Sequence, residues 1–214
     1  MKKTLVMASF IILFLLLGAF VYYAFWSESR DQKIIVLDPG HGGKYPGFES
    51  HGVMEKDIVF QISLYAKEEL ERRGYKVYMT RQGDIECNAN GYLKDLSCRP
   101  KLARKVHADL FVSIHANAFS KNEAVRGIES FYFTPFHDKK AAETLADSLA
   151  EETGMPVRFV KFGNFKVLRE STVPSVLIEI GYITNRDDFK LLSLPESQKQ
   201  IALGIVRGIE EYVR

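Results

Sequence analysis

The sequence has no excess of charge of either sign and no region of biased composition. Its formal net charge is +2, and Lys2 and Lys3 account for all of it. Proteins that bind nucleic acid carry a basic face or stripe, so this class is excluded. The sequence also has no internal repeat and no long linker. Its 46% hydrophobic and 26% charged residues predict one ordinary folded domain with a sizeable core.

Three common motifs are also missing. The glycines of "DPGHGG", residues 38–43, are not in the order G-x-G-x-x-G, and the following "KYPGFESHG" is unsuited to begin a helix, as a dinucleotide fingerprint requires. A Walker A loop needs G-K-[ST], and an α/β-hydrolase nucleophile needs G-x-S-x-G; neither occurs. The sequence therefore favours neither a phosphate-cradling loop nor a nucleophilic serine.

One long apolar run is present, near the N-terminus. Residues 5–25, "LVMASFIILFLLLGAFVYYAF", carry no charge. As a helix that rises 1.5 Å per residue they would span roughly 31 Å, about the hydrocarbon thickness of a bilayer. Lys2 and Lys3 precede the run and Trp26 follows it. This pattern predicts one transmembrane helix with a cytoplasmic N-terminus.

A cleavable signal peptide is the alternative for this segment. Cleavage after Ala19 or Ala24 would place a large residue at the −3 position, where signal peptidase needs a small one. We therefore expect an uncleaved membrane anchor over 1–26, a tether over 27–32 and a catalytic domain over 33–214. The catalytic domain is expected to be membrane-anchored and extracytoplasmic.

Strand patterns alternate with helical patterns after residue 33. This alternation predicts a single α/β domain with a mostly parallel twisted sheet of about six strands and helices on both faces. The clearest expected strands are 34–37, 75–80, 109–116, 128–134 and 174–183, and the clearest helices are 55–73, 138–153 and 195–214.

Two histidines and a glutamate are expected at one edge of this sheet. His41 follows the first strand, His115 ends the third, and Glu55 begins a helix. Sites in open α/β sheets form outside the carboxyl ends of strands. Two His and one carboxylate with an open fourth position are typical of catalytic zinc. His51 lies in the same loop region and is a weaker alternative ligand, since its neighbours favour a turn.

Glu179 lies in the middle of the apolar strand "SVLIEIG". A glutamate in a buried strand is costly unless it is paired, bound to a metal or functional. We therefore expect Glu179 to be the catalytic general base beside the metal.

Four segments of the chain resemble the zinc-dependent N-acetylmuramoyl-L-alanine amidases of the type 3 family. They are "VLDPGHGG", "EKD", "LFVSIHANA" and "VLIEIGYITN", in the order of the family and spread over 33–214. The resemblance implies one Zn²⁺ per chain on His41, Glu55 and His115, with Glu179 as the catalytic carboxylate. It also implies hydrolysis of the peptidoglycan amide between N-acetylmuramic acid and L-alanine. A membrane anchor with a bare catalytic domain resembles the sporulation-specific members that act on spore cortex, and an activating protein partner is left open.

Several interpretations remain open beside this one. A zinc peptidase acting on cell-wall peptides, or a non-catalytic envelope protein that binds glycan, are the alternative functions. Asn117 either orients the loop after His115 or binds substrate. Arg169 either binds a carboxylate of the substrate or forms a surface salt bridge.

The only cysteines, Cys87 and Cys98, lie in the irregular-looking stretch "DIECNANGYLKDLSCR". An extracytoplasmic location permits oxidation, and two cysteines in one irregular segment predict a disulfide. Two free thiols are the alternative. We expect the disulfide to stiffen a loop that borders the substrate groove without taking part in catalysis.

Overall fold

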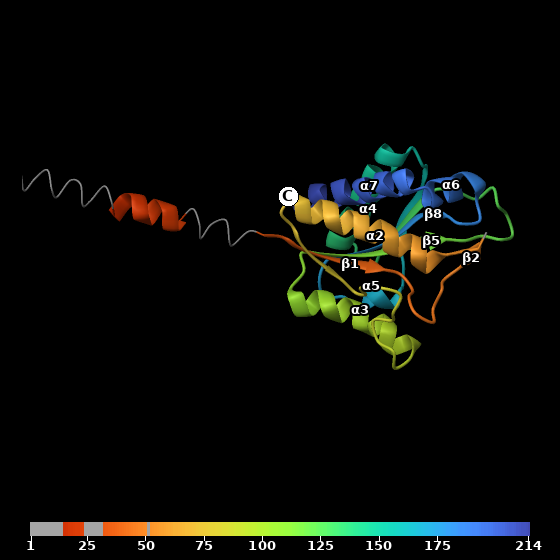
Figure 1. The fold of residues 1–214 in the computed structure, drawn as a ribbon, viewed down its shortest axis with the longest axis horizontal. Coiled ribbons are helices and arrows are strands. Elements are labelled where there is room, and N and C mark those ends of the chain that lie inside the picture. The colour runs from red at the N-terminus through yellow and green to blue at the C-terminus, as the bar shows by residue number, and fades with distance from the viewer. Residues whose placement is uncertain (1–14, 24–31, 51) are drawn as a thin grey trace, which may run out of the picture. The chain divides into compact units, whose positions relative to one another are not determined.

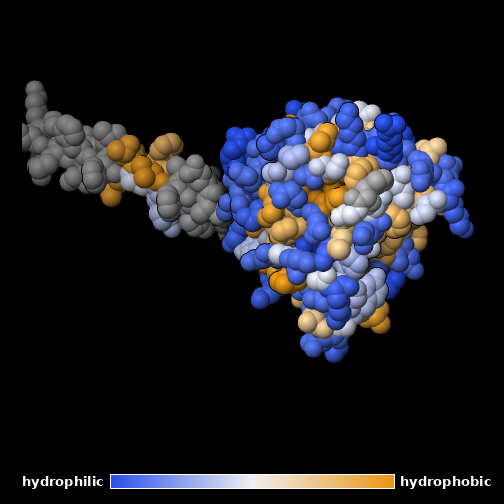
Figure 2. All heavy atoms as spheres, turned by 45° about the vertical axis from the view of Figure 1, so that its right-hand side comes forward, coloured by the Kyte–Doolittle hydropathy of each residue, from blue (hydrophilic) through white to orange (hydrophobic). Residues whose placement is uncertain are grey.

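The computed structural model describes residues 15–23, 32–50 and 52–214. The chain divides into two compact units, Met1–Gln32 and Lys33–Arg214. The second unit carries the sheet and the helices that pack on it, and the face shown in Figure 2 is mostly hydrophilic with apolar areas between.

A six-stranded sheet forms the centre of the second unit (Figure 1). Its order is β4-β1-β5-β8-β6-β7, and every pairing is parallel except that between β6 and β8. The predicted α/β class and strand number are confirmed, but the sheet is mixed. The strands are β1 (Ile34–Pro39), β4 (Lys76–Met79), β5 (Leu110–Asn117), β6 (Ile128–Tyr132), β7 (Val157–Phe162) and β8 (Ser175–Tyr182); a separate hairpin contains β2 (Glu49–Ser50) and β3 (Val53–Met54).

The antiparallel orientation of β6 follows from the connection that precedes it. Residues 118–127 join β5 to β6 and contain no helix. A parallel connection usually needs a crossover of a dozen or more residues, most often with a helix. The short loop therefore brings the chain back in the opposite direction, and β6 pairs with β8.

Helices cover both faces of the sheet, as predicted (Figure 1). Residues of β1 alternate between two apolar clusters, with Ile35 and Leu37 on one face and Val36 on the other. The first face packs against α2 (Glu55–Arg72), α4 (His137–Thr153) and α7 (Pro195–Val213), the second against α3 (Tyr92–Val106) and the short α5 (Lys166–Arg169), and α6 (Arg186–Ser193) follows β8.

Helix α3 occupies part of the stretch that looked irregular in the sequence. It begins at Tyr92, and its buried positions include Asp95, Arg99 and Ala103. Two of its four buried residues, Asp95 and Arg99, are charged. Sequence periodicity detects helices by an apolar stripe, and these two charged residues interrupt that of α3.

The predicted transmembrane helix over 5–25 is not borne out. In the described part of that run, residues 15–23 are helical, which corresponds to roughly 14 Å, less than half of a bilayer's hydrocarbon thickness. Among the described residues, no helix is long and apolar enough to cross a membrane. The rest of the run and residues 27–31 of the expected tether lie outside the described residues.

Candidate active site

Three side chains from distant parts of the sequence converge at the carboxyl edge of the sheet. His41 lies just after β1, His115 lies near the end of β5, and Glu55 is the first residue of α2. Glu55 Oε1 is 3.0 Å from His41 Nε2 and 2.9 Å from His115 Nδ1. One ligand atom from each residue lies within 4.8 Å of the others.

These three residues fit a zinc ion. Imidazole nitrogens and a carboxylate oxygen are typical zinc ligands, and two such atoms on a tetrahedral ion at about 2.1 Å are roughly 3.4 Å apart. The separations of 2.9 and 3.0 Å from Glu55 Oε1 are close to that value. Small shifts of the side chains are enough to admit the ion.

Two glycines make this convergence sterically feasible. A Cβ atom on Gly40 would lie 2.3 Å from the His115 ring, and one on Gly47 would lie 2.4 Å from Glu55 Oε2. Real Cβ atoms do not approach other atoms so closely. The glycines around His41 therefore let the backbone pass beside the three candidate ligands.

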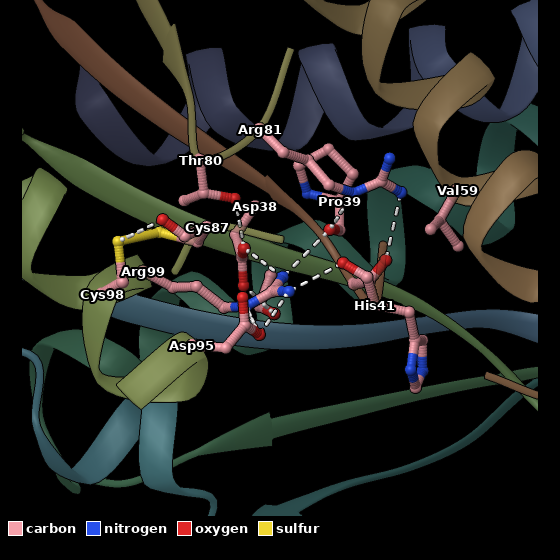
Figure 3. A network of polar contacts seen from close by, with 12 residues as sticks. Asp38, Pro39, His41, Val59, Thr80, Arg81, Cys87, Asp95, Cys98 and Arg99 are labelled. Carbon is pink, nitrogen blue, oxygen red and sulfur yellow. Dashed lines mark hydrogen bonds and ion pairs between the residues drawn. A yellow bond between two sulfur atoms is a disulfide. The ribbon is translucent and has the colours of Figure 1, made fainter. Parts of the chain in front are cut away.

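His41 has a left-handed backbone conformation, with a φ of 61°. This conformation is unfavourable for a residue with a Cβ atom, so the surrounding structure must hold it. Arg99 does so by donating 2.7 Å to the carbonyl of His41 and 3.1 Å to that of Pro39 (Figure 3). The imidazole of His41 points away from this network (Figure 3).

Asp38 and Asp95 balance the charge of Arg99. Arg99 donates to Asp38 Oδ1 at 2.9 Å and to Asp95 Oδ2 at 2.9 Å, and all three residues are at most 1% exposed. Thr80 and Ser113 also donate to the Asp38 carboxylate. Burial alone would raise the pKa of Asp38, but the charge of Arg99 and these hydroxyl hydrogen bonds hold it below its usual range.

Arg81 supports the same loop from the other side. It donates to the carbonyls of Pro39, Gly40 and Lys56, so it joins the loop after β1 to the start of α2. The loop of His41 is therefore held by two buried arginines, Arg81 and Arg99, that the sequence did not identify as partners. In the sequence Arg81 and Arg99 look like ordinary arginines, because only the fold decides that they are buried.

Glu179 lies beside this cluster in the sheet. It is the cross-strand neighbour of His115 in the β5–β8 pairing. Its Oε2 is buried and has no hydrogen-bond partner among the described residues. Burial is the largest cause that raises the pKa of Glu179 to about 8, and the nearby carboxylates of Glu55 and Glu129 raise it further against the opposing charge of His115.

Glu55 and His115 shift each other's pKa in opposite directions. Burial would raise the pKa of Glu55, but the hydrogen bonds and charges of His115 and His41 hold it well below its usual range. Burial would lower the pKa of His115, but the hydrogen bond and charge of Glu55 raise it. The cluster thus favours an ionised carboxylate, which is the form that binds a cation.

The weaker candidates have separate environments. Asn117 donates its Nδ2 to Glu129 Oε2 at 3.1 Å and accepts from the Ala118 amide at 2.7 Å. Arg169 lies on α5 and donates to Asn164 Oδ1 at 2.6 Å. These contacts show where the two side chains lie and leave substrate binding a prediction, while His51 lies outside the described residues.

Cys87 and Cys98 are joined by a disulfide. It connects the loop before α3 to the helix itself, one residue before Arg99. In that loop Asp84 accepts a hydrogen bond from the Gly43 amide at 2.8 Å. The disulfide therefore lies in a segment that contacts the loop of His41.

A groove lies beside the cluster. Its volume is about 460 Å³. The amide of Phe48, one of its lining residues, donates to Glu55 Oε2 at 3.1 Å, which links the groove to the metal-ligand cluster. The charged residues that line it are Glu49, Glu123 and Arg186.

Comparison with known proteins identifies the family of the chain. A family model described as N-acetylmuramoyl-L-alanine amidase matches residues 35–211. The germination-specific N-acetylmuramoyl-L-alanine amidase of Bacillus subtilis (strain 168) is 31% identical over 229 aligned residues, which cover 99% of this chain and 96% of the relative.

Two solved structures show the same fold at similar identity. The CwlD amidase from Clostridioides difficile, solved in complex with the GerS lipoprotein, is 32% identical with a TM-score of 0.79, and the match covers 85% of this chain and 98% of that one. The catalytic domain of CwlV, an amidase from Bacillus (Paenibacillus) polymyxa var. colistinus, is 34% identical with a TM-score of 0.75, and covers 85% and 98%. Because the family model spans most of the sequence, this protein belongs to the N-acetylmuramoyl-L-alanine amidase family and is a peptidoglycan amidase.

Proposed function

We propose that the protein cleaves the amide between N-acetylmuramic acid and L-alanine as a zinc enzyme, with His41, Glu55 and His115 as the zinc ligands. The observation that carries this proposal is the convergence of their three ligand atoms within 4.8 Å at the carboxyl edge of the sheet. Open α/β sheets form their sites at this edge. Three protein ligands also leave the fourth position that a catalytic ion needs.

Glu179 is the proposed base and proton carrier. A zinc ion, when bound, lowers the pKa of a water molecule to roughly 7 and polarises the scissile carbonyl. The carboxylate of Glu179 takes the proton of the attacking water and then gives it to the departing alanine nitrogen. Its buried Oε2, which has no hydrogen-bond partner among the described residues, suits a group that holds a proton between these two steps.

The groove beside Glu55 is the proposed site of the stem peptide. Its lining carries both acidic and basic side chains, from Glu49, Glu123 and Arg186. A stem peptide carries free carboxylates and, in many walls, a free amine, so charges of both signs complement it. No nucleic acid is expected as a partner, since the chain has no net basic excess outside its first residues.

The cellular setting is proposed from the relatives and from the disulfide. Because the Bacillus subtilis relative is named germination-specific, we propose that this amidase acts on spore peptidoglycan. Because peptidoglycan and stable disulfides both occur outside the cytoplasmic membrane, we place its action there. Because the Clostridioides difficile amidase was solved with a lipoprotein, we propose a protein partner for this one.

Mass analysis of digested peptidoglycan tests the proposed reaction. The expected products are free stem peptides that begin with L-alanine and glycan strands that carry free lactyl groups. Products cut between amino acids would instead indicate a peptidase, and no release would indicate a binding protein. Metal analysis should find about one zinc per chain, and Glu179→Gln should keep this zinc and lose ~10²-fold or more of the activity.

A further inference from the structure

A row of functional side chains continues past Glu179 onto a third strand. Glu179 of β8 has His115 of β5 as its neighbour on one side and Glu129 of β6 on the other. Cross-strand neighbours project from the same face of a sheet. The carboxylate of Glu129 therefore lies on the same side of the sheet as the proposed base and a proposed metal ligand.

Glu129 is buried and joined to three other strands. It is only 4% exposed. Its Oε2 accepts a hydrogen bond from Asn117 Nδ2 of β5 at 3.1 Å. Its Oε1 accepts from the hydroxyl of Tyr182 at the end of β8 and pairs with Arg158 Nε of β7 at 3.1 Å. One carboxylate thus contacts all of the strands that follow β1 in the sheet.

These contacts lie where the sheet ladder itself is irregular. The register of β5 against β8 shifts between His115 and Asn117, so regular backbone pairing does not continue directly past the two functional residues. Asn117 is two residues beyond His115, and Tyr182 is three residues beyond Glu179. Glu129 holds both of these following residues and so replaces part of the missing ladder.

Arg158 gives this buried carboxylate a cationic partner. The register of β6 against β7 shifts between Ile128 and Glu129, where Val157 and Phe159 are the partners, so Arg158 is the extra residue of a bulge. Bulges re-aim side chains near active sites. The guanidinium lies 3.1 Å from Glu129 and 5.3 Å from the centre of the Tyr182 ring.

We infer that Glu129 is a positioning residue of the amidase reaction: it joins the strand end after His115 to the strand end after Glu179 and so sets the distance between metal ligand and base. This inference rests on the proposed roles of those two residues. Glu129 does not touch the reacting atoms. Because a displacement of about 1 Å is enough to cost 10²-fold in rate, loss of this connection should act on turnover more than on substrate binding.

The test is the kinetic effect of Glu129→Gln in the full chain on muropeptide release. We expect kcat to fall about 10- to 100-fold with KM changed less than about 3-fold, and zinc content to stay near one per chain. Asp138→Asn is the matched control, because Asp138 is also 4% exposed and holds β8 at its opposite end through the Ser175 amide. The control should lower Tm and leave kcat unchanged.

A double variant separates positioning from general stability. If Glu129 acts through Glu179, Glu129→Gln should cause little further loss of kcat in a Glu179→Gln background. Tyr182→Phe removes one contact of Glu129 and should lower kcat by a smaller factor than Glu129→Gln. This variant tests the inference if Glu129→Gln does not fold. Unchanged kcat in both variants, with Tm lowered as in Asp138→Asn, would overturn the inference. Release of stem peptides by the wild-type protein tests the proposed function separately.

Discussion

Replacement of Arg99 by methionine is the most informative test of how the loop of His41 is held. Methionine has a similar length and no charge, so it fills much of the space and removes only the polar contacts. Arg99 is the cation that contacts both Asp38 and Asp95, and all three are buried. The substitution therefore leaves two carboxylates in the core without their counter-ion.

The expected cost follows from this burial. Removal of one partner of a buried ion pair lowers the free energy of unfolding by about 3–5 kcal/mol, because the remaining charge is uncompensated. The lost hydrogen bonds to the carbonyls of Pro39 and His41 place the value toward the upper end. For a protein of this size the decrease in Tm should be roughly 6–20 °C.

The loss should also depend on pH in a defined direction. In the wild-type protein the pKa of Asp38 is lowered, so its contribution to stability is present above the ordinary value of 3.8 and is lost as pH falls through the lower, folded value. Without Arg99, burial is the largest remaining influence and raises the pKa of Asp38. The variant can then neutralise the carboxyl by protonation, and its deficit should be smaller at about pH 5 than at pH 7.

Urea unfolding followed by circular dichroism at both pH values measures these differences. Arg104→Met is the matched control, since Arg104 lies on the same helix and is exposed. It should change the free energy of unfolding by less than about 0.5 kcal/mol. A deficit for Arg99→Met that equals this control, or that does not shrink at the lower pH, would refute the account of the buried network.

Three further predictions concern the metal, the base and the disulfide. His115→Ala should lose both zinc and activity while His107→Ala, at an exposed helix end, keeps both; zinc retained by the first variant in metal analysis would exclude the ligand assignment. In zinc-free protein, the raised pKa of Glu179, about 8 against an ordinary 4.5, should lower stability by on the order of 5 kcal/mol as pH rises between these values. Glu179→Gln should remove this pH dependence of stability in thermal unfolding. The same pH dependence in the variant would show that Glu179 is not its cause. Cys87→Ser should cost about 3 kcal/mol of stability by the chain-entropy model and keep zinc; two titratable thiols in the unreduced wild-type protein would show that the disulfide does not form.

The sequence determined which residues meet at the site because local patterns carried that information. Three local features are unfavourable for stability unless they serve a function. They are the glycines around His41, the aspartate-proline turn after a strand and the glutamate inside an apolar strand. The α/β class followed equally well, since it depends on the order of apolar patterns along the chain. In contrast, the transmembrane helix predicted from the apolar run is not borne out among the described residues, because hydropathy alone does not establish the length of a helix.

Only the tertiary structure decided which charged side chains are buried together. Asp38, Arg99 and Glu129 are ordinary polar residues in the sequence, and their partners are up to 75 positions away. Strand order and register select those partners, and a short connection before β6 sets its direction. Such pairings depend on distances across the sheet, which local periodicity does not encode. The ligands of the site were therefore visible in the sequence, whereas the buried network that holds them required the fold.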